Sequence, residues 1–236
     1  MLDWLALGPV EQQALYLSLR VALASLALTL PLALLVSYIL ARHEFPGKKI
    51  INGIVYLPLV MPPVVTGYLL LLALGRTGPV GAWLEHTFGI VVAFRWTGAA
   101  IAAAVTGFPL AVGAMRLSLE AVDRRIEAAA STLGAGRIWI FLTITLPLTL
   151  PGIVTGSILA FARALGEFGA TITFVSNIRG ETQTLPLAIY SLIQVPGQEP
   201  AAMRLLVISV VLAFVALVAA EVFNRSMRRH WLGDNA

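Results

Sequence analysis

The residues with the clearest chemical potential in this chain are a base and an acid at the end of an apolar run. Arg163 and Glu167 stand four residues apart, a spacing that places both side chains on one face of a helix. Charged residues within or beside apolar segments are energetically costly, so they normally pair with each other or face a polar path. Two interpretations are therefore open: the pair fixes the packing of helices, or it contacts something that passes through the protein.

Enzymatic and metal chemistry receive little support from the remaining residues. The chain has no cysteine, and His43, His86 and His230 lie far apart. It contains neither a Gly-x-Ser-x-Gly nucleophile element nor a Gly-x-x-x-x-Gly-Lys-Ser/Thr phosphate loop, and Gly134-Ala-Gly136 lacks the third glycine and the preceding strand of a dinucleotide site. We expect no catalytic residue, no metal ligand and no cofactor in this chain.

The composition is that of a membrane protein. Of the 236 residues, 58% are hydrophobic and only 12% are charged, and the mean hydropathy is +0.88. Soluble domains carry about 25% charged residues. The formal net charge of +4 does not indicate nucleic-acid binding, because in a membrane protein the placement of Lys and Arg matters more than their sum. The stretch before the first apolar run lacks the basic residues of a secretory leader, so we expect that run to be retained.

Long uncharged runs define the membrane spans, since a helix needs about 20 residues to cross the hydrocarbon layer. Five spans are predicted, at residues 21–41, 50–75, 96–115, 138–162 and 203–223. A further uncharged stretch, residues 182–198, is interrupted by Pro186, Pro196 and Gly197, so we interpret it as a short helix outside the membrane. The predicted fold class is an all-α membrane protein with five transmembrane helices.

The basic residues between the spans predict the orientation, because loops rich in Lys and Arg stay in the cytoplasm. Most of them lie in the connection at residues 42–49, in the segment 116–137 and in the C-terminal tail around 225–229. These three segments are expected inside the cell. Five spans then place the N-terminus in the periplasm and the C-terminus in the cytoplasm.

Prolines and small residues predict the shape of two spans. Pro58, Pro62 and Pro63 remove helical hydrogen bonds within a short stretch, so we expect the second span to bend and to line a cavity. Small residues recur at every fourth position of the fourth span, and such a ridge lets another helix backbone approach closely. The members of the ridge are Gly152, Gly156, Ala160 and Ala164.

The segment between the third and fourth spans predicts a short cytoplasmic helix. Asp123 can cap a helix at about residues 124–133, and Gly134 supplies a stop signal. A small apolar patch on this helix cannot fold by itself and suits a groove on a partner, although an ordinary connection between two helices is the alternative. The patch comprises Ala129, Ala130 and Leu133.

The same loop carries a pattern that resembles the signature loop of bacterial ABC-importer permeases. The pattern consists of Glu127, Ala129-Ala130 and Leu133-Gly134-Ala135, followed by Ile144-x-Leu146-Pro147, with nine residues between Gly134 and Ile144. The resemblance implies a coupling helix that docks into a cleft of a separate ATPase subunit. Many members have Glu directly before the Ala pair, where this chain has Ala128. The expected ATPase-coupling residues are Glu127, Ala129, Ala130, Leu133, Gly134 and Ala135.

The resemblance covers about residues 15–225 and narrows to the molybdate branch of these permeases. The segments that carry it are ARHEFPGKK, YLPLVMPPVVTGYLLL, TITLPLTLPGI, FARALGEFGATITFVSN and ETQTLPLAIYSLIQVPG. Sulfate permeases share ALGEFGA, so that element alone does not choose the substrate. The resemblance implies the type I ABC importer permease fold as one domain over residues 1–236. Its parts are a core at about 15–225, a cytoplasmic coupling loop at about 116–142 and a periplasmic loop at about 170–203.

The resemblance also implies an assembly in the bacterial inner membrane. Two copies of the chain would bind two cytoplasmic ABC ATPases, which hold ATP and magnesium, and a periplasmic oxyanion-binding protein. The path for a tetrahedral oxyanion should offer weakly binding hydroxyl donors, because tight binding would prevent release. The expected path residues are Thr66, Ser157, Arg163, Glu167, Thr171, Thr173 and Ser176.

Other functions stay open at this point. Import of sulfate, thiosulfate or tungstate is the alternative within the transporter class. A channel that needs no ATPase would explain the prolines and the ridge of small residues, but it would leave the cytoplasmic loop unexplained. An intramembrane enzyme has the least support, because the chain has no cysteine and no cluster of histidines.

Overall fold

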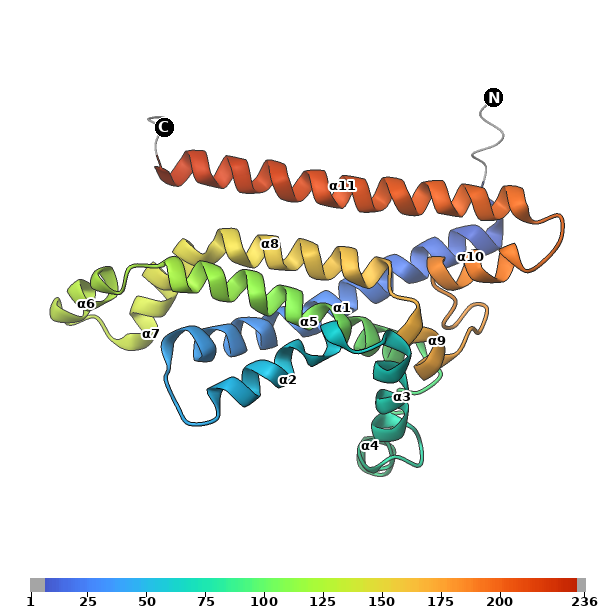
Figure 1. Cartoon of the computed structure of the whole chain (residues 1–236), viewed down its shortest axis with the longest axis horizontal. Helices are drawn as coiled ribbons and strands as arrows, with labels where there is room; N and C mark the ends of the chain where they lie inside the picture. The colour runs from blue at the N-terminus through green and yellow to red at the C-terminus, as the bar shows by residue number, and fades with distance from the viewer. Residues whose placement is uncertain (1–6, 233–236) are drawn as a thin grey trace.

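The computed structural model describes residues 7–232, with side chains described for all of these except 220 and 223–232 (Figure 1). All regular structure in this range is helical, which confirms the predicted all-α class. The two ends of the predicted domain, residues 1–6 and 233–236, lie outside the described residues, as do the side chains of the basic C-terminal tail.

Four helical stretches are long and apolar enough to cross a membrane, and they run along the long axis of the molecule (Figure 1). They are α1 (Pro9–Arg42), α5 (Trp96–Ala121), the stretch Arg137–Leu165 and the apolar part of α11 (Glu199–Leu232). The third of these is built from α7 (Arg137–Ile140), the π-helix η2 (Phe141–Thr145) and α8 (Leu146–Leu165). Several helices of this length and composition make the chain a multi-pass membrane protein.

The predicted second span is broken rather than continuous. It consists of α2 (Lys48–Val60) and α3 (Pro63–Leu74), whose axes meet at 114°. The cause is local: Pro62 and Pro63 cannot donate backbone hydrogen bonds, and each forces an extended backbone on the residue before it. Met61 and Pro62 accordingly have ψ angles of 146° and 132°. The bend was predicted for the span at residues 50–75, although its angle was not.

Three shorter helices join the long ones. They are α4 (Pro79–Phe88), α9 (Gly169–Val175) and α10 (Leu185–Ile193). The last lies within residues 182–198 and confirms the short helix predicted there, whereas α4 and α9 were not predicted. The start of α10 is tied to α1 because the Leu185 amide donates a hydrogen bond to the buried Ser18 hydroxyl at 2.6 Å.

The ridge of small residues on α8 packs against α5, as predicted. All four of its members are buried. A Cβ atom added at Gly152 would lie 2.2 Å from Ser118 Cβ, and one at Gly156 would lie 3.0 Å from the Ala111 carbonyl oxygen. A larger side chain at Gly152 would therefore push the two helices apart.

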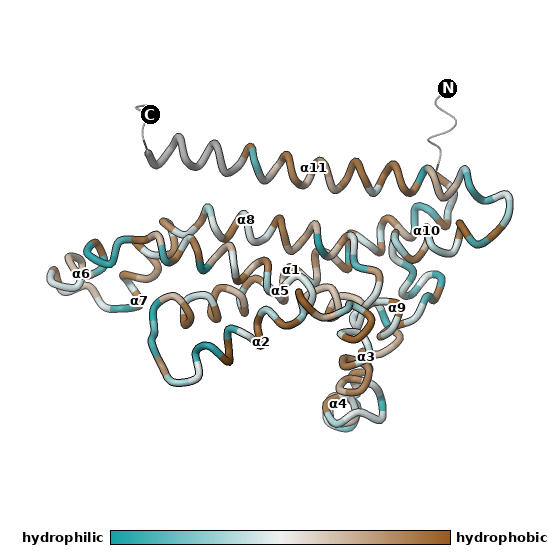
Figure 2. The backbone as a smooth tube through the Cα atoms, in the orientation of Figure 1, coloured by the Kyte–Doolittle hydropathy of each residue, from teal (hydrophilic) through white to brown (hydrophobic). Residues whose placement is uncertain are grey.

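Apolar residues cover the outer surface as well as the core. Figure 2 shows hydrophobic residues along the long helices and hydrophilic ones at the connections between α1 and α2 and near α6. On α11 the exposed fractions of Val210, Phe214 and Leu217 are 60%, 65% and 60%. A soluble protein rarely exposes such a continuous apolar face, so this surface faces lipid or another subunit.

Candidate functional site

The predicted cytoplasmic helix is present as α6 (Arg124–Thr132), and it lies at the tip of the molecule, beyond the end of α5 (Figure 1). The Asp123 carboxylate accepts a hydrogen bond from the Arg125 amide at 2.9 Å, so Asp123 is the cap that the sequence indicated. The helix stops at Leu133, and Gly134 has a φ angle of +86°. That left-handed conformation favours glycine, which explains the stop signal.

The coupling-loop residues present an open surface. Every residue of α6 is at least partly exposed. Leu133 is 89% exposed, Ala129 and Gly134 are exposed, and Ala130 and Ala135 are half-buried. A leucine so far from any packing partner in its own chain is the natural contact point for another protein.

The apolar surface at this tip is larger than the sequence indicated. Ile138 and Trp139 are 77% and 65% exposed, and Ile126 on α6 is 48% exposed. Both residues belong to α7, at the same tip as α6 and at the start of the apolar stretch Arg137–Leu165 that matches the predicted fourth span (Figure 1). The π-helix that follows is a rare element, often found at functional positions, and composition does not reveal it.

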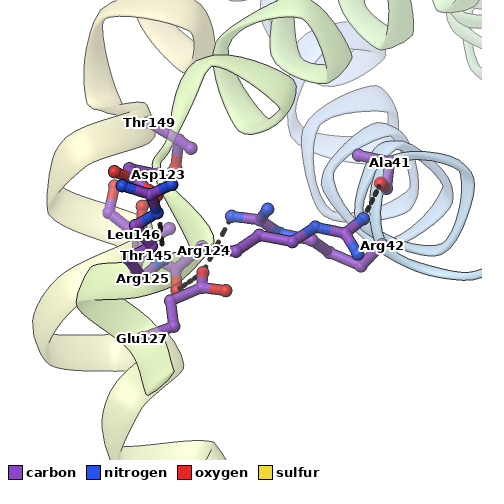
Figure 3. A network of polar contacts seen from close by, with 9 residues as sticks. All are labelled: Ala41, Arg42, Asp123, Arg124, Arg125, Glu127, Thr145, Leu146 and Thr149. Atoms are coloured by element: carbon purple, nitrogen blue, oxygen red, sulfur yellow. Dashed lines mark hydrogen bonds and ion pairs between the residues drawn. The ribbon is translucent and has the colours of Figure 1, made fainter. Parts of the chain in front are cut away.

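Glu127 holds α6 against two other helices (Figure 3). Its Oε1 atom accepts hydrogen bonds from Arg42 Nη2 at 2.8 Å and from Thr145 Oγ1 at 2.6 Å. Arg42 ends α1 and Thr145 ends η2, so a single carboxylate oxygen connects three elements. Charge-assisted hydrogen bonds of this kind are stronger than neutral ones.

A second link runs in the opposite direction between the same two helices. Arg124 Nη2 donates a hydrogen bond to the Ala41 carbonyl oxygen at 3.1 Å, while Arg42 donates to Glu127 (Figure 3). The two bonds bridge the end of α1 and the start of α6 reciprocally. We did not single out Arg42 and Thr145 from the sequence, because only the tertiary structure brings residues 85 positions apart together.

The Arg163–Glu167 pair forms at the end of α8. Arg163 Nη2 lies 3.0 Å from Glu167 Oε2, and the Glu167 side chain is 1% exposed. Glu167 Oε1 accepts a hydrogen bond from the Ala170 amide at 2.8 Å, so the same carboxylate caps the first turn of α9. This geometry gives Glu167 a role in helix packing and leaves Arg163, which is 31% exposed, partly accessible.

Three predicted path residues lie on α3 and α9, which are in close contact. A Cβ atom added at Gly67 of α3 would lie 2.4 Å from the Ala170 carbonyl oxygen of α9. Thr66 and Thr171 are buried, and Thr173 is half-buried with its hydroxyl donating to the Gly169 carbonyl oxygen. The buried Thr66 hydroxyl has no hydrogen-bond partner within the described part of the chain. The Thr66 hydroxyl is therefore an unused hydrogen-bonding group in the interior.

Ser157 and Ser176 lie away from that contact. The Ser157 hydroxyl donates to the Ile153 carbonyl oxygen at 2.6 Å, and its helix neighbours Ile153 and Phe161 pack against clusters that include α1 residues. Ser157 thus sits on the α1 side of α8. Ser176 is exposed and ends α9 with φ +64° and ψ −165°, a conformation that strains any residue except glycine. The seven predicted residues do not form one compact site.

Comparisons with known proteins identify the family. Residues 18–229 match the family described as binding-protein-dependent transport system inner membrane component. The chain belongs to this family. It is 56% identical over 218 residues, 92% of its length, to the molybdenum transport system permease protein ModB of Escherichia coli (strain K12), and it covers 95% of that relative. It is 37% identical over 178 residues to the sulfate transport system permease protein CysW of Synechococcus elongatus, 75% of this chain and 62% of that relative.

A solved structure supports the fold. The crystal structure of a bacterial ABC transporter involved in the import of the acidic polysaccharide alginate has a TM-score of 0.73 at 19% identity, covering 93% of this chain and 80% of that one. At that identity the likeness concerns the arrangement of helices alone. It confirms that the resemblance noted in the sequence extends to the tertiary structure.

In this inner membrane component, α8 lies between the predicted ATPase-coupling residues and the predicted path residues Arg163 and Glu167. Thr145, which bonds to Glu127, directly precedes α8, and Arg163 lies in its last turn. The 20 residues of α8 rise by about 1.5 Å each, so the helix spans about 30 Å. A displacement of the tip at α6 would therefore reach the Arg163–Glu167 end through one rigid element.

Proposed function

We propose that this chain is the permease subunit of an ATP-driven molybdate importer in the bacterial inner membrane. The observation that carries the proposal is the identity of 56% over almost the full length of a molybdenum transport permease. The identity to a sulfate permease is 37% and covers less of both chains. Alternating access between inward-open and outward-open states would carry the anion across the membrane.

The proposed assembly has two copies of the chain, two cytoplasmic ABC ATPases with bound ATP and magnesium, and a periplasmic oxyanion-binding protein. The family description names binding-protein-dependent transport, which supports the last of these. The basic residues support an N-terminus in the periplasm and a C-terminus in the cytoplasm. The ends of α1 and α5 that carry Arg42 and Arg116 lie at the same end of the molecule as α6 (Figure 1).

In the proposed mechanism, α6 and its flanking residues dock into a cleft of the ATPase. Ala129, Ala130, Leu133, Gly134 and Ala135 supply the contact surface, which is open in the free chain. Glu127 has a different task, because its carboxylate is already bonded to Arg42 and Thr145. It passes movement of the docked helix on to other elements.

The same bonds decide which helices move. Through Glu127 and Arg124 the docked helix pulls on α1, and through Glu127 and Thr145 it pulls on η2 and α8. ATP drives the cycle only if the ATPases bind one state of the permease more tightly than the other. The coupling loop is then the part of the permease through which this difference in ATPase affinity acts.

For the translocation path we propose Thr66 and Thr171 as the central hydroxyls. Both are buried, they lie on the contacting helices α3 and α9, and the Thr66 hydroxyl is free of protein partners in the described region. Thr173 and Ser176 extend the same α9 segment, and Ser157 lies deeper on α8. Arg163 acts as an electrostatic guide whose charge Glu167 balances, which keeps anion binding weak enough for release.

Uptake of labelled molybdate tests the function. Cells that express this chain with its ATPase and binding protein should accumulate molybdate, and excess sulfate should not compete. Loss of uptake in excess sulfate would assign the protein to sulfate and thiosulfate transport, and competition by tungstate alone would assign it to tungstate. Uptake without the ATPase would overturn the coupling proposal and leave a channel.

The coupling loop has its own test in Gly134→Leu. Nothing lies within 4 Å of a Cβ atom at Gly134, so the main cost of the substitution is the positive φ angle, and the docked surface changes shape. We expect ATP hydrolysis to persist while uptake falls. Gly197→Leu is the matched control, because Gly197 has φ +85° and equally open surroundings but lies before α11 at the other end of the molecule. Normal transport by the Gly134 variant would contradict the docking role.

A further inference from the structure

A cavity of about 640 Å³ lies beside the connection between α1 and α2, and its walls are basic. We call it the basic pocket and define it by Glu44, Lys48, Lys49, Asn52 and Arg116. These residues come from the connection, from the first turns of α2 and from α5. Three cations and one carboxylate leave a formal charge of +2 (3 − 1) on the walls.

Two of the three cations, Lys48 and Arg116, already pair with carboxylates, and the remaining donors define what the pocket could bind. Lys48 Nζ lies 2.7 Å from Glu44 Oε1, and this hydrogen bond lowers the pKa of Glu44, so the pair stays ionised and neutral overall. Arg116 forms an ion pair with Glu120, outside the pocket walls. Lys49 has no hydrogen bond or ion pair to any described side chain and is exposed.

The amide of Asn52 is oriented by its neighbour. Asn52 Oδ1 accepts a hydrogen bond from Arg116 Nη1 at 2.6 Å. The Asn52 Nδ2 donors consequently point away from Arg116, and no described protein atom accepts from them. Lys49, Asn52 and the unused N–H groups of Arg116 together offer donors without acceptors, which is the donor set that binds a phosphate group.

A second cavity, which we call the groove, lies one helical turn further along α2 and α5 and is also lined by α8. Asn52 is followed on its face of α2 by Tyr56 and Leu59, at spacings of four and three residues. Gly113 precedes Arg116 by three residues on α5 and lies on the same face. Tyr56, Leu59 and Gly113 line the groove, a cavity of about 610 Å³ whose walls also include Leu117.

We propose that the basic pocket and this groove together bind an anionic phospholipid, with the phosphate in the pocket and an acyl chain in the groove. Basic pockets at the cytoplasmic side of membrane helices bind such headgroups. A small dianion would match the pocket alone, whereas an amphiphile matches both parts. Leu117, 71% exposed beside Arg116, is where the chain would enter. The site rests on the proposed membrane orientation but not on the identity of the transported anion.

Lipid binding to the purified full-length chain tests the site. Native mass spectrometry would compare dioleoylphosphatidylglycerol with dioleoylphosphatidylcholine, which has the same acyl chains and no net charge. We expect preferential retention of phosphatidylglycerol. Lys49→Gln should weaken that binding roughly fivefold, the usual effect of one cation near a charged headgroup. Because Lys49 is exposed and forms no hydrogen bond or ion pair with a described side chain, the variant should fold normally.

Arg137→Gln is the matched control, because Arg137 is an exposed cation at the same end of the molecule but outside the pocket. Equal weakening by the two substitutions, or equal retention of the two lipids, would overturn the site and leave only general surface attraction. Inorganic phosphate or molybdate that stabilised the chain as much as the lipid, in a Lys49-dependent way, would also overturn the lipid assignment. Dihexanoylphosphatidylglycerol, with short chains, should bind more weakly if the groove contributes. These measurements need no transport, so their failure is separate from failure of the proposed function.

Discussion

Glu167 and Glu127 each pair with an arginine, and the two ion pairs have different roles. Glu167 pairs with Arg163 one helical turn earlier and caps the helix that follows, so all its partners are local. Glu127 pairs with Arg42, 85 positions away, and with Thr145. The first carboxylate is 1% exposed and the second 22% exposed.

The two ion pairs differ in what they connect: one joins neighbouring turns of the chain, and the other joins helices that are far apart in sequence. A buried local pair such as Arg163–Glu167 holds one turn of chain in place, and its removal leaves an unpaired charge. The Arg42–Glu127 pair, with side chains 8% and 22% exposed, joins distant elements and makes them move together. We therefore expect substitutions at Glu167 to act on folding and substitutions at Glu127 to act on coupling.

The largest effect on stability should come from Glu167→Ala. This change removes the cap of α9 and leaves Arg163, whose side chain is 31% exposed, without its partner; losing a hydrogen bond to a charged group costs about 1.5–3 kcal/mol. Thermal unfolding of the purified chain in detergent would measure the loss. Glu167→Gln is the control, since its amide oxygen can still accept from the Ala170 amide, and it should lose less. Equal stability of Glu167→Ala and the unmodified chain would remove the contrast between the two glutamates.

The second effect is on transport. Glu127→Gln weakens both bonds of the carboxylate but leaves its size unchanged, so we expect a stability loss of about 1 kcal/mol. Coupling free energies of about 1–3 kcal/mol correspond to changes of roughly 5- to 150-fold, so uptake per ATP hydrolysed should fall at least fivefold. Uptake and ATPase activity in reconstituted vesicles would give that ratio. An unchanged ratio would show that Glu127 is only a structural contact.

The smallest effect on stability should come from Leu133→Ser. Leu133 is 89% exposed, and surface substitutions usually change stability by less than about 0.5 kcal/mol. Association with the ATPase should nevertheless weaken, because the largest apolar side chain of the patch is lost. Thermal unfolding would measure the stability, and copurification of the ATPase would measure the association. Leu117→Ser, which is also highly exposed but lies on α5, is the control that should leave association intact.

Much of the architecture could be predicted from the order of residues. The uncharged runs located four long helical stretches, Asp123 and Gly134 located the ends of α6, and the small residues of α8 indicated its close approach to α5. These features depend on neighbours within a few positions, where hydrophobicity, capping and side-chain size act directly. The family pattern in the coupling loop is likewise continuous in sequence.

The tertiary structure decided what distant residues do to one another. It showed that the second span turns by 114°, that α4 and α9 are helical, and that Ile138 and Trp139 are exposed at the same tip as α6. It also gave Glu127 the partners Arg42 and Thr145. The hydrophobic effect drives an apolar segment out of water, but it does not specify which helix the segment packs against. An ion pair between distant helices forms only after packing has brought those helices together.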